Sequence, residues 1–189
     1  IYVIIIMRNY KNRKNYIKQG GFFMDAVLNR RSIRKFQDKK VSETDIKDLL
    51  EAGMSAPSAG NEQPWHFIII NDREILEKIP EIHEYADMVK KAPVAILVCG
   101  DLNEQKHGGF WDQDCAAATE NILITIQEKG LGGVWCGIHP NKKRIKEFNQ
   151  LFELPENIIP FSLIPLGYPA ENKPPEDRFN ESRIHKNQW

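Results

Sequence analysis

Apolar positions recur with a helical period early in the chain. Over residues 46–54 they fall at i, i+3, i+4, i+7 and i+8, which places them on one face of a helix. Ser42 has a side chain suited to an N-cap, and Asp45 follows three residues later as in a capping box. The pattern predicts a helix that starts after Ser42 and buries Ile46, Leu49, Leu50, Gly53 and Met54.

Continuous apolar runs predict the strands. Residues 65–70 are rich in aromatic and β-branched side chains, and residues 94–100 are a continuous apolar run, the pattern of a strand buried on both faces. A third run, residues 160–169, is interrupted by prolines, which favour a sheet edge or the ends of a strand. A fourth strand is expected after the glycines at 130, 132 and 133.

Helical segments separate these runs. Residues 73–91 are charged and helical in pattern, and residues 141–152 form an amphipathic helix. Residues 111–129 end at Gly130, a residue typical of helix ends, and their small and apolar side chains run nearly all round the helix. In a chain this short, such a helix suggests contact with a protein partner.

Composition sets broad limits on function. With 189 residues, of which 41% are hydrophobic, the chain can bury one sizeable core, so we expect one domain. The formal net charge is zero, which argues against a nucleic-acid-binding protein. Three scattered cysteines and five histidines form no disulfide framework or metal-ligand pattern, so no metal is expected.

Residues 1–23 differ in charge from the rest of the chain. They hold five Lys and Arg and no acid, whereas residues 24–189 hold 21 Lys and Arg against 26 Asp and Glu. Their apolar run is too short to span a membrane, and their charges follow that run instead of preceding it as in a secretory signal. Codons for residues 18–24 can spell a ribosome-binding sequence before Met24. We therefore expect a leader at 1–23, a domain at 24–189, no membrane association and a cytoplasmic protein.

A cluster of cations lies between the first two predicted helices. Residues 30–35 contain four cationic side chains and one hydroxyl. Arginine presents a fixed fork of donors that suits a phosphate, and hydrogen bonds to charged groups contribute roughly 1.5–3 kcal/mol each. This basic turn, Arg30 to Lys35, is a candidate anion site, and a solvated surface turn is the alternative.

The segment after the predicted helix is a loop rich in amides. Pro57 and Pro64 prevent it from continuing as a helix. Asn61 and Gln63 each offer a donor and an acceptor, which suits the edge of a heterocycle. The alternative is a connecting loop whose amides face water.

The glycines at 130, 132 and 133 do not make a dinucleotide fingerprint. Such a fingerprint follows a strand and opens a helix, whereas these glycines follow a helix and open a strand. The sequence also lacks a P-loop and a G-x-S-x-G elbow, so hydrolase and triphosphatase functions find no support.

The order and spacing of the basic turn, the loop 56–67 and the W-x-G segment, Trp135 to Gly137, resemble the nitroreductase family of FMN-dependent oxidoreductases. The resemblance implies that the basic turn holds the FMN phosphate and one flavin edge, and that the loop reaches the flavin from the partner subunit. It also implies that the W-x-G segment passes beside the redox-active edge and that a late cation, Arg178 or else Arg183, returns to the phosphate. The expected cofactor-binding residues are Arg30, Arg31, Ser32, Arg34, Pro57, Ser58, Asn61, Gln63, Trp135, Cys136, Gly137 and Arg178.

The resemblance further implies an α+β fold with a central mixed sheet of four or five strands wrapped by helices, assembled as an intertwined homodimer. The implied reaction is ping-pong: NADH or NADPH reduces FMN, and a small-molecule acceptor such as a nitroaromatic or a quinone then takes the electrons. No side chain is expected to act as a catalytic acid, base or nucleophile, because the flavin carries the chemistry. The alternatives are other flavin chemistry in the same superfamily (enone reduction, dehalogenation or flavin fragmentation) and a non-catalytic protein that stores or senses FMN.

Overall fold

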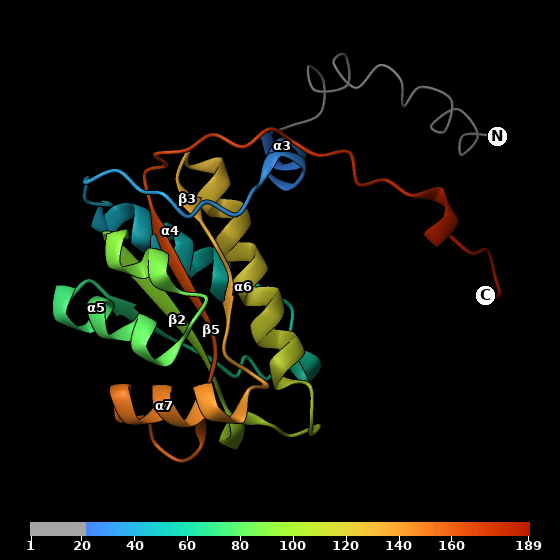
Figure 1. The fold of residues 1–189 in the computed structure, drawn as a ribbon. Helices are drawn as coiled ribbons and strands as arrows, with labels where there is room; N and C mark the ends of the chain where they lie inside the picture. The colour runs from blue at the N-terminus through green and yellow to red at the C-terminus, as the bar shows by residue number, and fades with distance from the viewer. Residues whose placement is uncertain (1–21) are drawn as a thin grey trace.

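The computed structural model describes residues 22–189 (Figure 1). The first described helix begins at Phe22, so residues 1–21 of the expected leader lie outside the described residues. The main elements in chain order are α3 (Phe22–Asn29), α4 (Glu43–Met54), β1 (Trp65–Ile70), α5 (Arg73–Ile82), β2 (Val94–Asp101), α6 (Trp111–Glu128), β3 (Gly132–Gly133), β4 (Cys136–Gly137), α7 (Lys142–Phe152) and β5 (Ile158–Gly167). Short 3-10 turns are η2 (Ala59–Asn61), η3 (Asp87–Lys91), η4 (Leu102–Glu104) and η5 (Glu181–Arg183).

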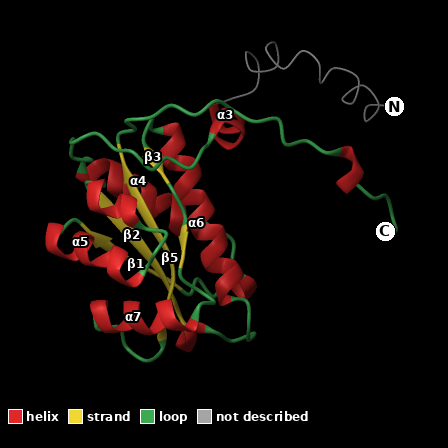
Figure 2. Ribbon diagram, in the orientation of Figure 1, coloured by secondary structure: helices red, strands yellow, loops and turns green. Residues whose placement is uncertain are grey.

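The strands form one five-stranded sheet in the order β1-β2-β5-β3, and β4 also pairs with β5 (Figure 2). The expected α+β fold with a sheet of four or five strands is confirmed. All four strand pairs are antiparallel, so the expectation that these strands form a mixed sheet was wrong. Parallel pairing in the described residues is limited to an isolated bridge between Ser32 and Gly133.

The position of β5 corrects one expectation. Its prolines favoured a sheet edge, but β5 lies inside the sheet, with β2 on one side and β3 and β4 on the other. Pro160 lies opposite Cys99, where the register of β2 and β5 shifts. Pro165 lies opposite the gap between β3 and β4, and its carbonyl accepts the N–H of Val134 at 3.3 Å. Interruptions in the neighbouring strands therefore accommodate the missing proline N–H groups.

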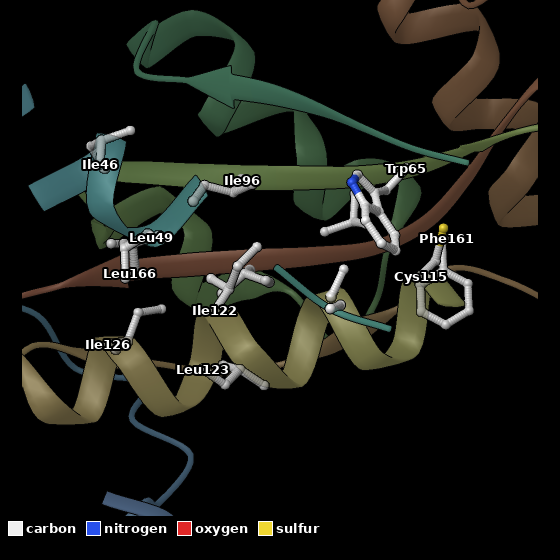
Figure 3. Packing of buried hydrophobic residues seen from close by; sticks show 14 of the residues in the cluster. Ile46, Leu49, Trp65, Ile96, Cys115, Ile122, Leu123, Ile126, Phe161 and Leu166 are labelled. Carbon is white, nitrogen blue, oxygen red and sulfur yellow. The ribbon is translucent and has the colours of Figure 1, made fainter. Parts of the chain in front are cut away.

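Helices cover both faces of the sheet, and side chains of β2 alternate between the two cores. Val94, Ile96 and Val98 pack with α4, α6 and the facing side of β5, as Figure 3 shows for Ile96 with Ile46, Leu49 and Ile122. Ala95, Leu97 and Cys99 pack with α5 and α7 on the opposite face. This two-sided burial explains why the strand reads as a continuous apolar run.

The expected helix ends are confirmed at α4 and α6. The Ser42 side chain accepts the N–H of Asp45 at 3.0 Å at the start of α4. At the end of α6, Gly130 has a φ of +68°, a left-handed conformation that glycine adopts without strain.

The C-terminal segment leaves the sheet after β5 and extends away from the body of the fold (Figure 1). Its first residues are held by Arg31, whose Nε donates to the carbonyl of Pro174 at 2.9 Å. Among residues 22–189, none of the helices combines the length and the apolar character that a membrane crossing requires.

Candidate functional site

The outer edge of the sheet at β3 and β4 presents backbone groups that β5 does not use. Val134 and Ile138 donate their N–H groups to Pro165 and Phe161 of β5, at 3.3 and 3.0 Å. Hydrogen-bonded and non-hydrogen-bonded residues alternate along an antiparallel pair. Gly133, Trp135 and Gly137 therefore direct their N–H and C=O groups away from β5. We call these outward groups the β3–β4 edge.

The basic turn lies against one end of this edge. The N–H of Ile33 donates to the carbonyl of Gly133 at 3.0 Å, beside the bridge between Ser32 and Gly133. A Cβ on Gly132 would stand 2.7 Å from the Ile33 side chain, so glycine permits the close approach of the two segments. The fold thus brings together two of the three segments singled out in the sequence.

The three arginines of the basic turn have different surroundings. Arg30 pairs with Glu120 of α6 at 3.2 Å. Arg31 is 8% exposed and donates to the carbonyls of Leu28, Arg30 and Pro174, while its Nη2 has no partner among the described residues. Arg34 is exposed, and its positive charge acts on the Cys136 thiol. Of the three, Arg34 therefore combines access to solvent with proximity to the β3–β4 edge.

Two residues at the basic turn were not expected from the sequence. Lys173 donates from Nζ to the carbonyl of Ser32 at 2.7 Å, and Glu171 accepts the N–H of Arg34 at 2.6 Å. That N–H bond, with Lys173 as a further cause, lowers the pKa of the Glu171 carboxyl. Their sequence neighbours are ordinary polar and proline residues, and only the return of the chain after β5 brings them to the turn.

The expected late cation, Arg178, does not take this position in the single chain. It is exposed and pairs with Glu176 at 2.8 Å in the extended C-terminal segment, and Arg183 is exposed in η5. The cation from this segment that contacts the basic turn is Lys173.

Gly137 faces open space at the β3–β4 edge. A Cβ built on this glycine would meet no atom within 4 Å. Cys136 beside it is buried, and burial raises the pKa of its thiol to about 11, against the opposing influence of Arg34 and Arg144. The thiol is therefore protonated at neutral pH and unsuited to nucleophilic chemistry. Trp135 is half-buried, and its ring packs edge-on against Phe161 with the ring centroids 5.7 Å apart.

The amide-rich loop is held in a specific shape. Asn61 and Gln63 have φ values of +57° and +53°, and the N–H of Gln63 donates to the Ser58 hydroxyl at 3.0 Å. The Gln63 side-chain amide donates to Asn61 Oδ1 at 3.3 Å. Pro57, Asn61 and Gln63 are exposed, whereas Ser58 is half-buried. The loop therefore presents amides at the surface on a strained backbone, which favours a binding role over a passive connection.

Two buried acids, Glu62 and Asp114, accept hydrogen bonds that hold this loop in place. Glu62 accepts the N–H groups of Lys106 and His107, both at 2.6 Å. Asp114, in the first turn of α6, accepts the N–H of Ala59 at 3.1 Å, and burial raises the pKa of its carboxyl. Trp65, at the end of the loop, is 7% exposed and belongs to the core, as expected.

The loop and the basic turn lie toward opposite ends of α6. The loop contacts Asp114, whereas Leu131, which precedes β3, donates to Ile126 near the end of the helix. A rise of 1.5 Å per residue separates Asp114 from Ile126 by about 18 Å. Figure 1 shows α3 and β3 at the upper end of α6. Within one copy, the loop and the start of β3 are therefore anchored about 18 Å apart along α6.

The arrangement around the β3–β4 edge has a definite chemical character. It combines a row of backbone donors and acceptors, an open space beside a glycine, and the cations Arg34 and Lys173. These groups suit a flat polar heterocycle with an anionic tail. Within residues 22–189, no group of three or more His, Cys, Asp and Glu is placed to hold a metal ion.

Comparisons with known proteins agree on one family. The model described as "Nitroreductase family" matches residues 27–83 and 80–168. A protein of Methanothermobacter thermautotrophicus named "Putative NADH dehydrogenase/NAD(P)H nitroreductase" is 52% identical over 166 residues, which cover 88% of this chain and 87% of that protein.

Solved structures show the same fold. A crystal structure of a protein of the same name from Parabacteroides distasonis superposes with a TM-score of 0.86 at 38% identity, covering 90% of this chain and all of that one. The crystal structure of a "putative nitroreductase in complex with fmn" from Desulfovibrio desulfuricans superposes with a TM-score of 0.78 at 28% identity, covering 90% of this chain and 99% of that one.

Proposed function

The chain belongs to the nitroreductase family, and from this premise we propose that it binds FMN, takes hydride from NADH or NADPH, and reduces small acceptors such as nitroaromatics and quinones. The observation that carries the proposal is the pairing of Ile33 with Gly133 at 3.0 Å. This pairing joins the cationic turn to the outward backbone groups of the β3–β4 edge, so that anion-binding and ring-binding features share one surface.

The residues present fit FMN. The space beside Gly137, where a Cβ would meet nothing within 4 Å, admits a ring against the backbone. The outward N–H and C=O groups of Trp135 and the N–H of Gly137 match the donors and acceptors of a flavin edge. Donors for a phosphate and a ribityl chain come from the basic turn and the chain after β5, namely from Arg30, Ser32, Arg34 and Lys173. Arg31 already donates to backbone carbonyls through Nε and Nη1, so only its Nη2 could donate a hydrogen bond to FMN.

A bound FMN would accept the hydride from NADH or NADPH and pass the electrons to the acceptor, while the protein positions the reactants and stabilises charge. Negative charge develops on a flavin as it is reduced, and Arg34 together with the outward N–H groups is placed to stabilise it. Cys136 remains a protonated thiol because burial raises its pKa to about 11, so it does not compete as a nucleophile. Donor and acceptor bind the same open face in turn, which gives ping-pong kinetics and a short transfer distance.

We further propose that the site is completed by a second copy of the chain. The loop that holds Pro57, Ser58, Asn61 and Gln63 is fixed to Asp114, about 18 Å along α6 from Ile126, which bonds the residue before β3; we infer that in a homodimer the loop of one copy serves the site of the other. The stripe of α6 around Ile124 supports such contact, since this apolar side chain is only half-buried in one copy.

The experiment is anaerobic titration of the purified protein after incubation with FMN. We expect a yellow protein whose visible flavin absorbance bleaches on adding NADH or NADPH and returns on adding a quinone or a nitroaromatic. A protein that fails to retain FMN would contradict the proposal. Retention of FMN without bleaching by either nicotinamide would favour storage or sensing instead.

A further inference from the structure

The carbonyl oxygen of Gly137 accepts hydrogen bonds from two side chains. His83 Nε2 lies 3.0 Å from it, and Arg144 Nη1 also lies at 3.0 Å. His83 caps the end of α5, and Arg144 lies in the first turn of α7. Two helices on the same face of the sheet thus converge on one backbone atom of the β3–β4 edge. We call His83 and Arg144 the Gly137 clamp.

The hydrogen bonds fix the tautomer of His83. A carbonyl oxygen only accepts, so Nε2 carries the proton, while Nδ1 accepts the N–H of Tyr85 at 3.3 Å. The ring is 1% exposed and packs edge-on against Phe148. Burial, and secondarily the charge of Arg144, lower its pKa. His83 is therefore a neutral donor at neutral pH, with both ring nitrogens engaged.

Arg144 also has contacts besides the one to Gly137. Its side chain is 16% exposed, and Nη2 donates to Glu84 Oε1 at 3.0 Å. The guanidinium also lies 5.4 Å from the centroid of the Tyr85 ring. Glu84 and Tyr85 thus fix the guanidinium, and one of its N–H groups points at Gly137.

The position of Gly137 explains why such support matters. β4 is two residues long, and Gly137 belongs to a non-hydrogen-bonded pair with Ser162, so β5 does not fix its N–H or C=O. A glycine without contacts on its open side has more rotational freedom than any other residue. The two donors remove that freedom. They also offset the partial negative charge of a carbonyl oxygen at the edge of the site.

We infer that the Gly137 clamp is a pair of positioning residues for the redox site, which orients the Cys136–Gly137 segment and lowers the electrostatic cost of reducing a flavin there. The inference rests on the proposed binding of FMN. Both His83 and Arg144 are proposed to act through the Gly137 carbonyl and not by contact with the reacting atoms. Removing either donor leaves that carbonyl with one hydrogen bond instead of two, so the carbonyl is held less firmly and its partial negative charge is less offset, which disfavours the reduced, more negative flavin.

The test uses substitutions that remove the donors and keep the volume. His83→Phe retains a ring against Phe148, and Arg144→Met retains a long side chain without charge. His83→Gln and Arg144→Lys are the conservative partners, because each still places an N–H donor near Gly137. The two readouts are the dissociation constant for FMN, from quenching of flavin fluorescence, and the midpoint potential of bound FMN.

We expect His83→Phe and Arg144→Met to weaken FMN binding about tenfold and to destabilise reduced over oxidised FMN by a similar factor. For a two-electron couple, a tenfold change moves the potential by about 30 mV, here in the negative direction. His83→Gln and Arg144→Lys are expected to recover most of both changes. Arg73→Met is the matched control, since Arg73 also donates to two carbonyls, those of Lys90 and Ala92, at the other end of α5. It should lower stability and leave the potential unchanged.

Unchanged potentials in folded His83→Phe and Arg144→Met would overturn the inference, as would an equal shift in Arg73→Met. If His83→Phe does not fold, the midpoint potentials of bound FMN in His83→Asn and His83→Gln are compared instead. The shorter amide does not reach Gly137, so an equal potential in these two variants would also overturn the inference. A wild-type protein that binds no FMN would overturn the proposed function together with the clamp, whereas wild-type binding with unshifted variants would overturn the clamp alone.

Discussion

The N–H of Ile33 donates to the carbonyl oxygen of Gly133 at 3.0 Å, although the two residues lie in opposite halves of the chain. This bond ties the basic turn to the outer edge of the sheet. Beyond it, the edge continues with the outward groups of Trp135 and Gly137, and the Gly137 clamp closes the far end. The candidate site is thus the part of the sheet edge that lies between the Ile33–Gly133 hydrogen bond and the Gly137 clamp.

Gly137 is predicted to be a functional glycine. Its Cβ position is empty, so Gly137→Ala should change the free energy of unfolding by less than about 1 kcal/mol. The added methyl group occupies the space assigned to the cofactor ring, so we expect FMN to bind at least tenfold more weakly. Urea unfolding and flavin fluorescence titration measure the two effects.

Gly132 provides the structural contrast. A Cβ there would stand 2.7 Å from Ile33, and overpacking of this kind costs about 1–3 kcal/mol. Gly132→Ala is therefore expected to lower stability by that amount. If the two alanine variants showed the same ratio of stability loss to affinity loss, the distinct role assigned to Gly137 would be wrong.

Arg34 is predicted to stabilise the bound cofactor. Arg34→Ala should weaken FMN binding by roughly 1.5–3 kcal/mol, the contribution of hydrogen bonds to a charged group, and should slow reduction by NAD(P)H. Stopped-flow absorbance at saturating FMN separates the two effects. Lys78→Ala, which removes an exposed cation from α5, is the control and should behave as wild type. Equal cofactor content and rate in the Arg34 variant would remove this residue from the site.

The stability of the fold should depend on His83 below pH 6.5. The pKa of His83 is lowered from 6.5 by burial and by Arg144, with the hydrogen bond to Gly137 and the charge of Glu84 opposing, so the unfolded chain binds a proton more readily than the folded one. The contribution of neutral His83 is fully present above pH 6.5 and declines as the pH falls from 6.5 toward the lower folded pKa. Denaturant unfolding between pH 5 and 8 measures this.

His83→Gln lacks that titration, so its free energy of unfolding should vary less over the same range. The carboxyl pKa values of Asp45, Asp101 and Glu171 are lowered from ordinary values of 3.8, 3.8 and 4.5, so the stabilisation from these groups is lost only in more acidic solution. Parallel curves for wild type and variant between pH 5 and 8 would show that His83 is not held neutral by the fold.

The half-buried stripe of α6 is predicted to lie in a dimer interface. Placing a charge there with Ile124→Asp should produce a monomer that binds FMN weakly, because burying an unpaired carboxylate is costly and each site loses the partner's loop. Sedimentation velocity gives the mass, and Ile124→Val is the control that should remain dimeric. A monomeric wild type, or a monomeric variant with full FMN affinity, would contradict the shared site.

Local signals in the sequence predicted most of the fold and only part of the site. The capping residue Ser42, the buried run of β2 and the stop at Gly130 each depend on nearby residues, and all three appear as expected. The central place of β5 was missed because its prolines are accommodated by breaks in neighbouring strands, which no local pattern reveals.

Two site residues, Lys173 and His83, also have no local signal in the sequence. Lys173 and His83 are ordinary polar residues in their own segments, and neither is near the basic turn or the W-x-G segment in sequence. Lys173 reaches Ser32 only because the chain returns after β5, and His83 reaches Gly137 only because α5 ends beside β4. Such contacts depend on tertiary packing and require the structure.

Each FMN site is predicted to combine the basic turn of one copy with the amide loop of the other. The deciding experiment is FMN titration of a purified heterodimer, assembled from two differently tagged chains, that carries Arg34→Ala in one chain and Asn61→Ala in the other. If the site is shared, one site holds both defects and the other none, so the heterodimer should bind one FMN with wild-type affinity, whereas each mutant homodimer binds weakly. If both segments serve the same copy, each site in the heterodimer carries one defect, and the absence of any wild-type site would contradict the account.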